Sequence, residues 1–290
     1  MSASASPPST LSVAEQLRRC LADLTPAERR VARALLAVYP ASGLGTVAGL
    51  AEEASTSSAT VVRLVQKLGY TGFPEFQRTL RHELAIRRMG PVERVVSAGI
   101  EGADVFESMA KGLADATASI LATVRRSELE SAVALLSDTK RRVFLAGGRV
   151  SHSLAEYFAT HLGRMRQGVH LMPRDRMRRH AELLDLTRRD VLMILDFRRY
   201  ETAALDLATR ARQRDVRLIV VTDVLLSPAA RDATVVLPVE MGSPSPFDTS
   251  VPTIALLEVL RFSTLRALGP SALERMSDWD RLAEHEIVRE

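Results

Sequence analysis

Cysteine, lysine and long apolar runs are scarce in this sequence, and the scarcity of cysteine and of apolar runs each excludes a class of protein. The 290 residues include one cysteine, Cys20, so no disulfide can form within the chain. Apolar neighbours at helical spacing indicate that Cys20 fills a helical core. No run of about 18 uncharged apolar residues is present, so we expect no membrane contact and a cytoplasmic location. Residues 1–10, rich in Ser, Ala and Pro, lack the basic start of a signal peptide and predict a disordered tail.

The net positive charge is concentrated in the first third of the chain. Residues 1–90 contain 11 basic and 7 acidic side chains, whereas the remainder, from totals of 39 and 35, contains 28 of each. Only three of the 39 basic residues are lysine. So strong a preference for arginine is typical of codon bias, and the total charge is therefore a weak guide to binding partners. Residues 164–214 nevertheless contain 13 basic and 7 acidic side chains. This distribution favours duplex DNA near the N-terminus and a small anion further on, although solvated arginine-rich helices give similar counts.

The apolar pattern changes once along the chain and thereby divides it into two folded parts. Residues 11–90 show only helical periodicity and predict an all-α domain of five short helices. Residues 91–136 then predict a helical connector. Over 137–270, short apolar runs alternate with amphipathic helices, which predicts a doubly wound α/β domain with a parallel sheet, and 271–290 predicts a polar tail. The strand-like runs are 143–146, 191–195, 218–221 and 235–237.

Residues 46–69 have the pattern of a helix-turn-helix. In the second helix, Val61, Leu64, Val65 and Leu68 recur at core-facing spacing. The opposite side is polar, and a recognition helix needs such hydroxyl, arginine and lysine side chains to contact bases and phosphates. The alternative is an ordinary amphipathic helix pair with a solvated polar face. The predicted DNA-contacting residues are Ser57, which also suits the helix N-cap, and Ser58, Thr60, Arg63 and Lys67.

Three segments resemble a known family. They are Leu24-Thr-Pro-Ala-Glu-Arg-Arg-Val-Ala, Thr60-Val-Val-Arg-Leu-Val-Gln-Lys-Leu-Gly-Tyr and Gly72-Phe-Pro-Glu-Phe. Together they are similar to the N-terminal signature of RpiR-type regulators, which join a helix-turn-helix domain to a SIS (sugar isomerase) domain. The resemblance implies a transcriptional regulator, repressor or activator, whose SIS domain senses a phosphosugar or another small anionic metabolite.

The resemblance also implies a ligand site at the carboxyl ends of the parallel strands. A glycine-rich loop, Gly147 to Ser151, follows the first strand, although tight turns need glycine for backbone reasons alone. The family's serine-rich second loop is replaced here by residues 196–202, in which two arginines suit an anion but could instead form structural ion pairs. The predicted effector-binding residues are Gly147, Gly148, Arg149, Ser151, Arg198, Arg199, Thr202 and Thr222.

Two other function classes compete with this interpretation. A sugar-phosphate isomerase would need an acid–base pair, and the available side chains have no spacing that predicts a shared site. They are His152, His161, His170, His180, Glu156 and Glu258. A scaffold would have no use for the polar recognition stripe. No cofactor, catalytic residue or metal site is expected, whereas a homodimer or homotetramer on a palindromic operator is, because one short recognition helix reads too few bases.

Overall fold

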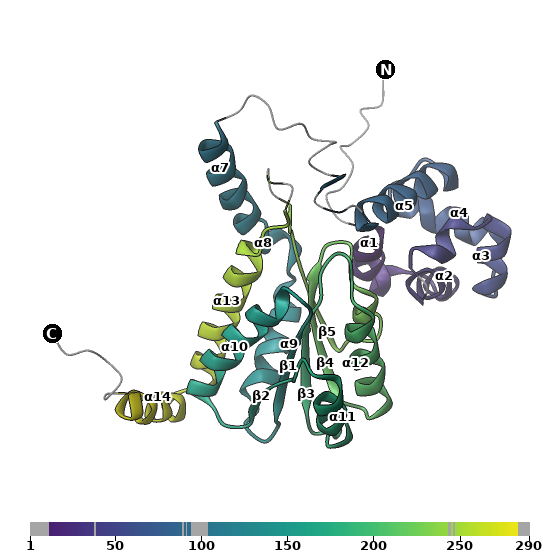
Figure 1. Cartoon of the computed structure of the whole chain (residues 1–290). Coiled ribbons are helices and arrows are strands. Elements are labelled where there is room, and N and C mark those ends of the chain that lie inside the picture. The colour runs from purple at the N-terminus through teal and green to yellow at the C-terminus, as the bar shows by residue number, and fades with distance from the viewer. Residues whose placement is uncertain are drawn as a thin grey trace. The chain divides into compact units, whose positions relative to one another are not determined.

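The computed structural model describes residues 12–37, 39–88, 90, 92–93, 104–242, 245 and 247–283. The tail predicted over residues 1–10 lies outside them. The chain divides into two compact units, residues 1–97 with 224–226, and residues 98–223 with 227–290. Figure 1 shows the helical unit and the α/β unit, and each is described by itself.

The first unit is entirely helical among its described residues. Its helices are packed around one core that includes the fully buried Val31, Val61, Leu64, Phe76 and Leu80. These are the positions at which the apolar residues recur with helical period. The elements are α1 (Val13–Cys20), η1 (Leu21–Asp23), α2 (Pro26–Ala37), η2 (Ala41–Leu44), α3 (Val47–Glu53), α4 (Ser58–Lys67) and α5 (Phe73–Arg88).

Hydroxyl side chains determine where these helices begin. The Oγ of Ser57 accepts a hydrogen bond from the backbone N–H of Thr60 at 3.3 Å and caps α4. At α2 the capping is reciprocal. The N–H of Thr25 donates to Glu28 Oε2 at 2.9 Å, and the N–H of Glu28 donates to Thr25 Oγ1 at 3.4 Å. Helix starts are therefore fixed by local chemistry that the sequence displays.

Gly43 allows the chain between α2 and α3 to approach α5 closely. A Cβ at this position would lie 2.3 Å from Leu80 Cδ1 and 3.1 Å from Leu35 Cδ2, both in the buried core. No larger residue fits without moving core side chains. From α5, Gln77 Nε2 donates to the Leu44 carbonyl at 3.1 Å and fixes the same segment.

The second unit is a five-stranded, all-parallel sheet between two layers of helices. The strand order is β2-β1-β3-β4-β5. Helices α9, α10 and α13 lie on one face, and α11 and α12 lie on the other (Figure 1). The elements are α7 (Val105–Ala118), α8 (Ile120–Thr123), α9 (Arg126–Ser137), β1 (Val143–Gly147), α10 (Ser151–Met165), β2 (Val169–Leu171), α11 (Arg176–Leu184), β3 (Val191–Leu195), α12 (Thr202–Gln213), β4 (Arg217–Asp223), η3 (Pro228–Ala230), β5 (Val235–Val239), α13 (Val251–Leu268) and α14 (Pro270–Ala283). The doubly wound fold class is confirmed.

The central strands are buried on both faces, as their continuous apolar runs predict. Along β3 every residue is buried, and Met193 belongs to the core on the α10 side while Ile194 faces the opposite layer. From β1 the chain passes to the outer strand β2 and then returns to β3. This reversal opens a crevice at the carboxyl ends of β1 and β3, which is where such sheets bind ligands.

The second unit contains more structure than the sequence pattern indicates. Strand β2 has only three residues and went unpredicted. The expected connector, residues 91–136, ends in a helix that packs on the sheet, where Leu136 is fully buried in the core. The predicted polar tail is wrong for residues 271–283, which lie in α14. Gly269, with a φ of 66°, ends α13, Pro270 begins α14, and Arg164 pairs with Asp280 at 2.7 Å.

Candidate DNA-reading helix and ligand-binding edge

The turn between α3 and α4 is held in place from α2. Arg30 donates from Nε to the carbonyl of Ala54 and from its terminal nitrogen to the carbonyl of Ser55, both at 3.3 Å. Ser55 has a φ of 49°, and the N–H of Thr56 donates back to the Ala51 carbonyl at 2.8 Å. These contacts fix the angle at which α4 leaves the turn, which gives residues 46–69 the helix-turn-helix geometry predicted from their pattern.

The solvent-exposed side of α4 differs from the predicted stripe at one position, Thr60. Ser57, Ser58 and Arg63 are exposed, as expected. Thr60 is buried, because its hydroxyl lies 3.0 Å from Ser57 Oγ and accepts from Arg63 at 3.4 Å. The prediction that Thr60 projects toward DNA is therefore wrong. Its hydroxyl is engaged at the start of the helix, where Ser57 and Thr60 meet.

Lys67 is exposed, as expected, but its ammonium group also has partners within the helical unit. Its Nζ donates to the Asp23 carbonyl at 2.7 Å and lies 3.5 Å from Glu28 Oε2, so the side chain ties the end of α4 to neighbouring segments. The residue that sequence reasoning missed is Gln66, which is exposed one helical turn beyond Arg63. Counting the helical period from the buried Val61 and Val65 would have identified it. Arg63 and Gln66 thus form the polar centre of the outer face.

In the second unit, the loop after β1 is tied tightly to β3. Ser151 Oγ accepts from the N–H of Gly148 at 2.8 Å and donates to the Leu195 carbonyl at 2.7 Å. Gly147 is required for a steric reason, since a Cβ there would lie 2.4 Å from the Ser151 carbonyl oxygen. The predicted Gly147–Ser151 loop therefore lies at the crevice, although the Ser151 hydroxyl is already engaged within the protein.

The carboxylate of Glu201, from another part of the chain, contacts this loop. Glu201, immediately before α12, accepts at Oε1 from the Arg149 N–H at 2.7 Å, and Arg149 Nε lies 3.4 Å from the same oxygen. A Cβ on Gly148 would lie 2.6 Å from it. The backbone N–H groups of such a loop are where α/β proteins hold anions. The chain thus places an acid of its own at the loop where the sequence predicts an anion, a contact the sequence does not reveal.

Glu201 also borders a cavity of about 210 Å³ whose charged lining is otherwise cationic. Arg149, Arg174 and Arg179 contribute guanidinium groups, and Arg174 donates to the Arg149 carbonyl at 3.3 Å. Arg179 is held by the carbonyls of Pro173 at 3.0 Å and of Arg174 at 2.7 Å. Arg174 and Arg179 were not predicted, because no motif marks the segment between β2 and α11. The remaining lining is Ala146, Gly147, Gly148, Ile194, Ala203, Ala204 and Leu207.

Five predicted effector residues lie outside the set that lines this cavity, and the first of them is Ser151, whose hydroxyl is engaged within the protein. Arg198 is mostly buried and paired with Asp248, its Nε 3.3 Å from Oδ2, so the structural ion pair is the correct alternative for it. Thr222 is fully buried, and its Oγ1 accepts from the Ser227 N–H at 2.9 Å, so it does not line a pocket. Arg199, with a φ of 64°, and Thr202, the first residue of α12, are exposed.

Comparison with known proteins agrees with both units. Residues 11–87 match the model of the helix-turn-helix domain of the rpiR family, and residues 135–262 match the SIS domain. The transcriptional regulator HexR of Escherichia coli is 25% identical over 267 residues, which cover 89% of this chain and 88% of HexR. The chain belongs to the RpiR family of transcriptional regulators.

Solved structures show the same fold in this RpiR-type chain. The Vibrio vulnificus NanR protein, solved with ManNAc-6P, is 20% identical with a TM-score of 0.56, and the match covers 95% of this chain and 99% of that one. The sugar isomerase domain of an RpiR transcription factor from Sphaerobacter thermophilus is 19% identical with a TM-score of 0.57, covering 62% and 99%. Among the described residues, no helix could cross a membrane and no cluster of His, Cys, Asp and Glu could hold a metal ion.

Asp196, directly after β3, is the most strongly perturbed acid at the ligand edge of this regulator. Burial raises its pKa from 3.8 to about 6, against hydrogen bonds from the Ser227 hydroxyl and the Glu201 N–H that favour the carboxylate. Nearby Asp223 and Glu201 add to the increase. Asp196 therefore changes charge close to neutral pH, between two loops that it connects.

The raised pKa predicts a stability difference that depends on pH. Because folding raises the pKa, the contribution of Asp196 to stability is full below pH 4 and is lost as pH rises through about 6. A pKa difference of about two pH units corresponds to roughly 3 kcal/mol. The free energy of unfolding of wild type should therefore fall between about pH 4 and 6 relative to that of Asp196→Asn, followed by the fluorescence of the single tryptophan, Trp279. Parallel curves for the two proteins would show that Asp196 does not titrate there.

Proposed function

We propose that this regulator binds DNA with an affinity that changes when a small anionic metabolite binds at the carboxyl ends of β1 and β3. The observation that carries the proposal is the convergence of Arg149, Arg174 and Arg179 on one cavity beside the Gly147–Ser151 loop. Arginine binds phosphate or carboxylate through paired N–H donors, and crevices at this edge are the usual ligand sites of α/β sheets. NanR, whose structure holds a phosphosugar, shares the fold and gives a chemical class to test first.

The effector's anionic group would displace Glu201 from the loop. In the described structure the Glu201 carboxylate pairs with Arg149, accepts the Arg149 N–H and shares the cavity lining with Arg174 and Arg179. An incoming phosphate or carboxylate would be repelled by Glu201 until that side chain turns away. A ligand can shift a conformational equilibrium only by binding one state better, and displacement of Glu201 supplies two such states.

Regulation is favoured over sugar isomerisation by the composition of the same cavity. Its described lining includes one carboxylic acid and no histidine, whereas isomerisation needs an acid–base pair at the sugar. Another candidate acid, Glu258, is held by Tyr157 and Arg261. Burial, followed by nearby Arg174, lowers the pKa of His152, and this histidine does not line the cavity.

DNA would be read by the outer face of α4. Arg63 suits a bidentate contact with guanine and Gln66 suits adenine, and the exposed hydroxyls of Ser57 and Ser58 lie at the N-terminal end of the helix, near phosphates or base edges. Lys67 has a supporting role, because its ammonium group is engaged by Asp23 and Glu28.

Substitutions on α4 should separate residues that read DNA bases from residues that support the fold of the helical unit. Arg63→Ala and Gln66→Ala should each reduce discrimination between matched and mismatched duplexes by about 1–3 kcal/mol. Lys67→Ala, the matched control on the same helix, should instead lower the stability of the helical unit by about 1 kcal/mol and leave base preference unchanged. Competition binding against duplexes varied one base pair at a time measures both effects. Unchanged preference in the Arg63 and Gln66 variants would contradict the assignment of α4.

Glu201 gives a test of the effector site. Glu201→Gln keeps the side chain's volume and can still accept the Arg149 N–H, but it removes the competing charge. An acidic effector, found by thermal-shift screening of phosphosugars and organic acids, should bind this variant about tenfold more tightly, because a short-range repulsion of roughly 1–2 kcal/mol is lost. Arg174→Ala should weaken the same ligand.

The matched control is Asp206→Asn, which makes the same charge change on the exposed side of α12, where Asp206 pairs with Arg210. Calorimetric titration of all four proteins should show no change for this control. Equal or weaker affinity in Glu201→Gln would mean that the anion binds away from the loop.

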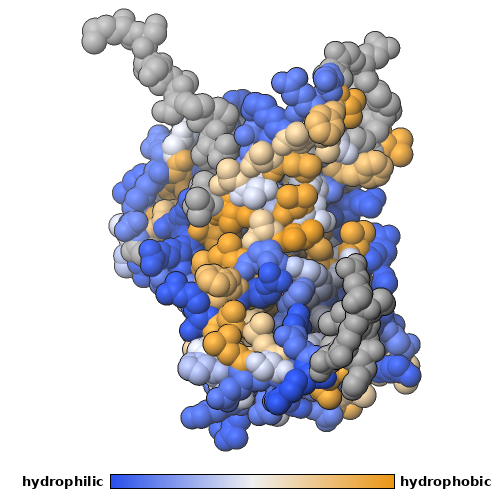
Figure 2. All heavy atoms as spheres, turned by 90° about the vertical axis from the view of Figure 1, so that its left-hand side faces the viewer, coloured by the Kyte–Doolittle hydropathy of each residue, from blue (hydrophilic) through white to orange (hydrophobic). Residues whose placement is uncertain are grey.

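The assembly should be a homodimer or a tetramer, formed in part through α13. Only three of its 18 residues, Glu258, Arg261 and Arg266, are charged, and apolar side chains lie on both sides of the helix. Helices that are apolar all round are normally buried, yet Val259 and Phe262 are exposed, as is Phe106 on α7, which packs against α13. Figure 2 shows hydrophobic residues gathered on this face. A second copy would cover them and supply a second recognition helix for a palindromic operator.

A charge placed on this face should dissociate the assembly. Phe262→Asp is expected to sediment as a monomer at micromolar concentration, since a carboxylate buried at an apolar interface is not solvated. Leu184→Asp alters a residue of similar exposure on α11, on the other side of the sheet, and should keep the wild-type mass. A monomeric wild-type protein with full DNA affinity would contradict the dimer.

A further inference from the structure

A second basic cavity lies at the edge of the sheet where the strands begin. It has a volume of about 530 Å³ and lies beside the first residues of β4 and the loop before β3. Its charged lining includes five arginines and two aspartates, a surplus of three positive charges. These are Arg141, Arg188, Arg189, Arg212, Arg217, Asp215 and Asp232. Because all strands are parallel, this cavity is at the opposite edge from Arg149 and Glu201.

Two arginines near this cavity have structural roles, and their contacts serve as a comparison for the arginines that line it. Arg142 donates to both oxygens of Asp190, at 2.9 and 2.8 Å, and to the Asp185 carbonyl at 2.8 Å. Arg166 donates to the carbonyls of Leu136 at 2.7 Å and Asp138 at 3.0 Å, at the C-terminal end of α9. Such contacts satisfy helix ends and buried acids. Neither Arg142 nor Arg166 lines the cavity.

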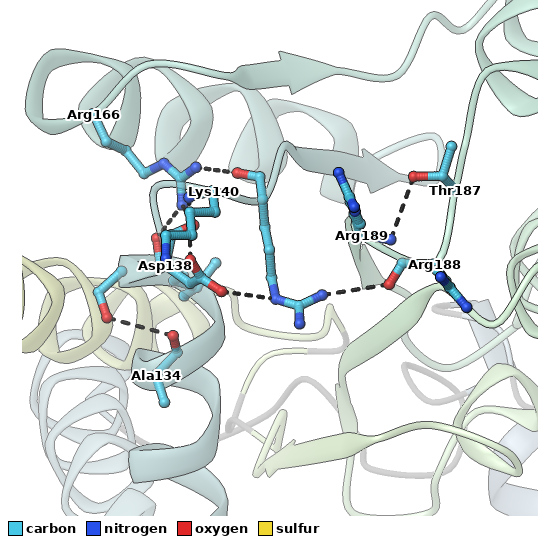
Figure 3. A network of polar contacts seen from close by, with 10 residues as sticks. Ala134, Asp138, Lys140, Arg166, Thr187, Arg188 and Arg189 are labelled. Atoms are coloured by element: carbon cyan, nitrogen blue, oxygen red, sulfur yellow. Dashed lines mark hydrogen bonds and ion pairs between the residues drawn. The ribbon is translucent and has the colours of Figure 1, made fainter.

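The arginines that line the cavity are used differently. Arg141 connects Asp138, at 2.9 Å, with the Arg188 carbonyl, at 3.4 Å. Figure 3 shows Asp138, Arg188 and Arg189 in this network of contacts. Arg212 pairs at 3.4 Å with the exposed Asp232. Exposed Arg188, Arg189 and Arg217 form no ion pair with any described residue.

The pairing register of β3 and β4 brings Arg217 and Arg189 to the same end of the sheet. Arg217 is aligned with Val191 across β3 and β4, and Arg189 precedes Val191 by two residues. Arg188 is adjacent in sequence, so three guanidinium groups without an acidic partner border one hollow. Like charges held beside a concave wall repel one another and raise the local concentration of anions.

We propose that this cavity binds a small molecule that carries two or more phosphate groups. Guanidinium groups match phosphate oxygens in pairs, and several of them need several phosphates for neutralisation. The cavity's volume is in the range of small-molecule sites, and its concave shape suits a compact polyanion better than a duplex. The site is separate from the effector edge, and its test does not depend on the function proposed there.

Two sources share this chemistry, inorganic polyphosphate and a nucleoside polyphosphate. A neighbouring cavity of about 300 Å³ shares Arg212 and Asp232 with the basic cavity and adds the apolar Leu205 and Pro228. It offers a surface for an organic group next to the phosphates. ATP should bind more tightly than tripolyphosphate if the organic group is recognised, and equally if only the phosphates are.

The experiment is calorimetric titration of the full chain with inorganic tripolyphosphate, with ATP as the second probe. We expect saturable binding that weakens at least tenfold in the double variant Arg189→Ala/Arg217→Ala, and also in Arg188→Ala. Arg126→Ala removes an arginine on α9 that pairs with Glu130 away from the cavity, and it should leave the affinity unchanged. Orthophosphate should bind more weakly than tripolyphosphate.

The proposal would be overturned if neither tripolyphosphate nor ATP showed saturable binding. It would also be overturned if both variants bound the probes with unchanged affinity. A loss of duplex-DNA affinity in the variants, without any binding of tripolyphosphate, would overturn it in favour of a contact with the DNA backbone. Because these three side chains are exposed, the substitutions leave the core untouched, and Trp279 fluorescence verifies that the α/β unit is folded.

Discussion

The carboxylate of Asp196 holds the candidate ligand edge of the α/β unit together. It accepts from the Ser227 hydroxyl after β4 and from the Glu201 N–H before α12, and Glu201 in turn reaches the Arg149 N–H after β1. Three loops from three strands are therefore linked through two acids. Because buried hydrogen bonds to charged groups are strong, this linkage sets the shape of the crevice. The two acids meet at Glu201, whose backbone N–H donates to Asp196 and whose carboxylate accepts from Arg149.

The sequence predicts the elements well because helix and strand periods are local properties. The capped start of α4, the buried β3 and the tight loop at Gly147 follow from neighbouring residues. Exposure along α4 was less predictable. Thr60 turns back to Ser57, and the flexible stem of Lys67 reaches a carbonyl 44 residues away. These side-chain orientations depend on partners elsewhere in the fold, which a helical wheel does not show.

The structure has a cavity beside the loop after β1, where the sequence predicts a ligand site, but most of the charged residues that line it were not predicted. Arg198 belongs to Asp248, 50 residues later, and Glu201 reaches a loop 52 residues earlier. Arg174 follows a three-residue strand too short to leave a pattern. Long-range pairing of arginine with acids is set by packing, so a sequence with 36 arginines among its 39 basic residues offers many equivalent choices.

The central claim is that two copies of this chain read DNA with paired α4 helices. Selection of duplexes from a random pool by the full-length protein tests it most directly, since no operator has to be assumed. The account predicts enrichment of an inverted repeat whose half-site centres are spaced by about one helical turn of roughly 10 base pairs, or a multiple of it. Enrichment of a single unrepeated half-site, or of no sequence at all, would contradict it.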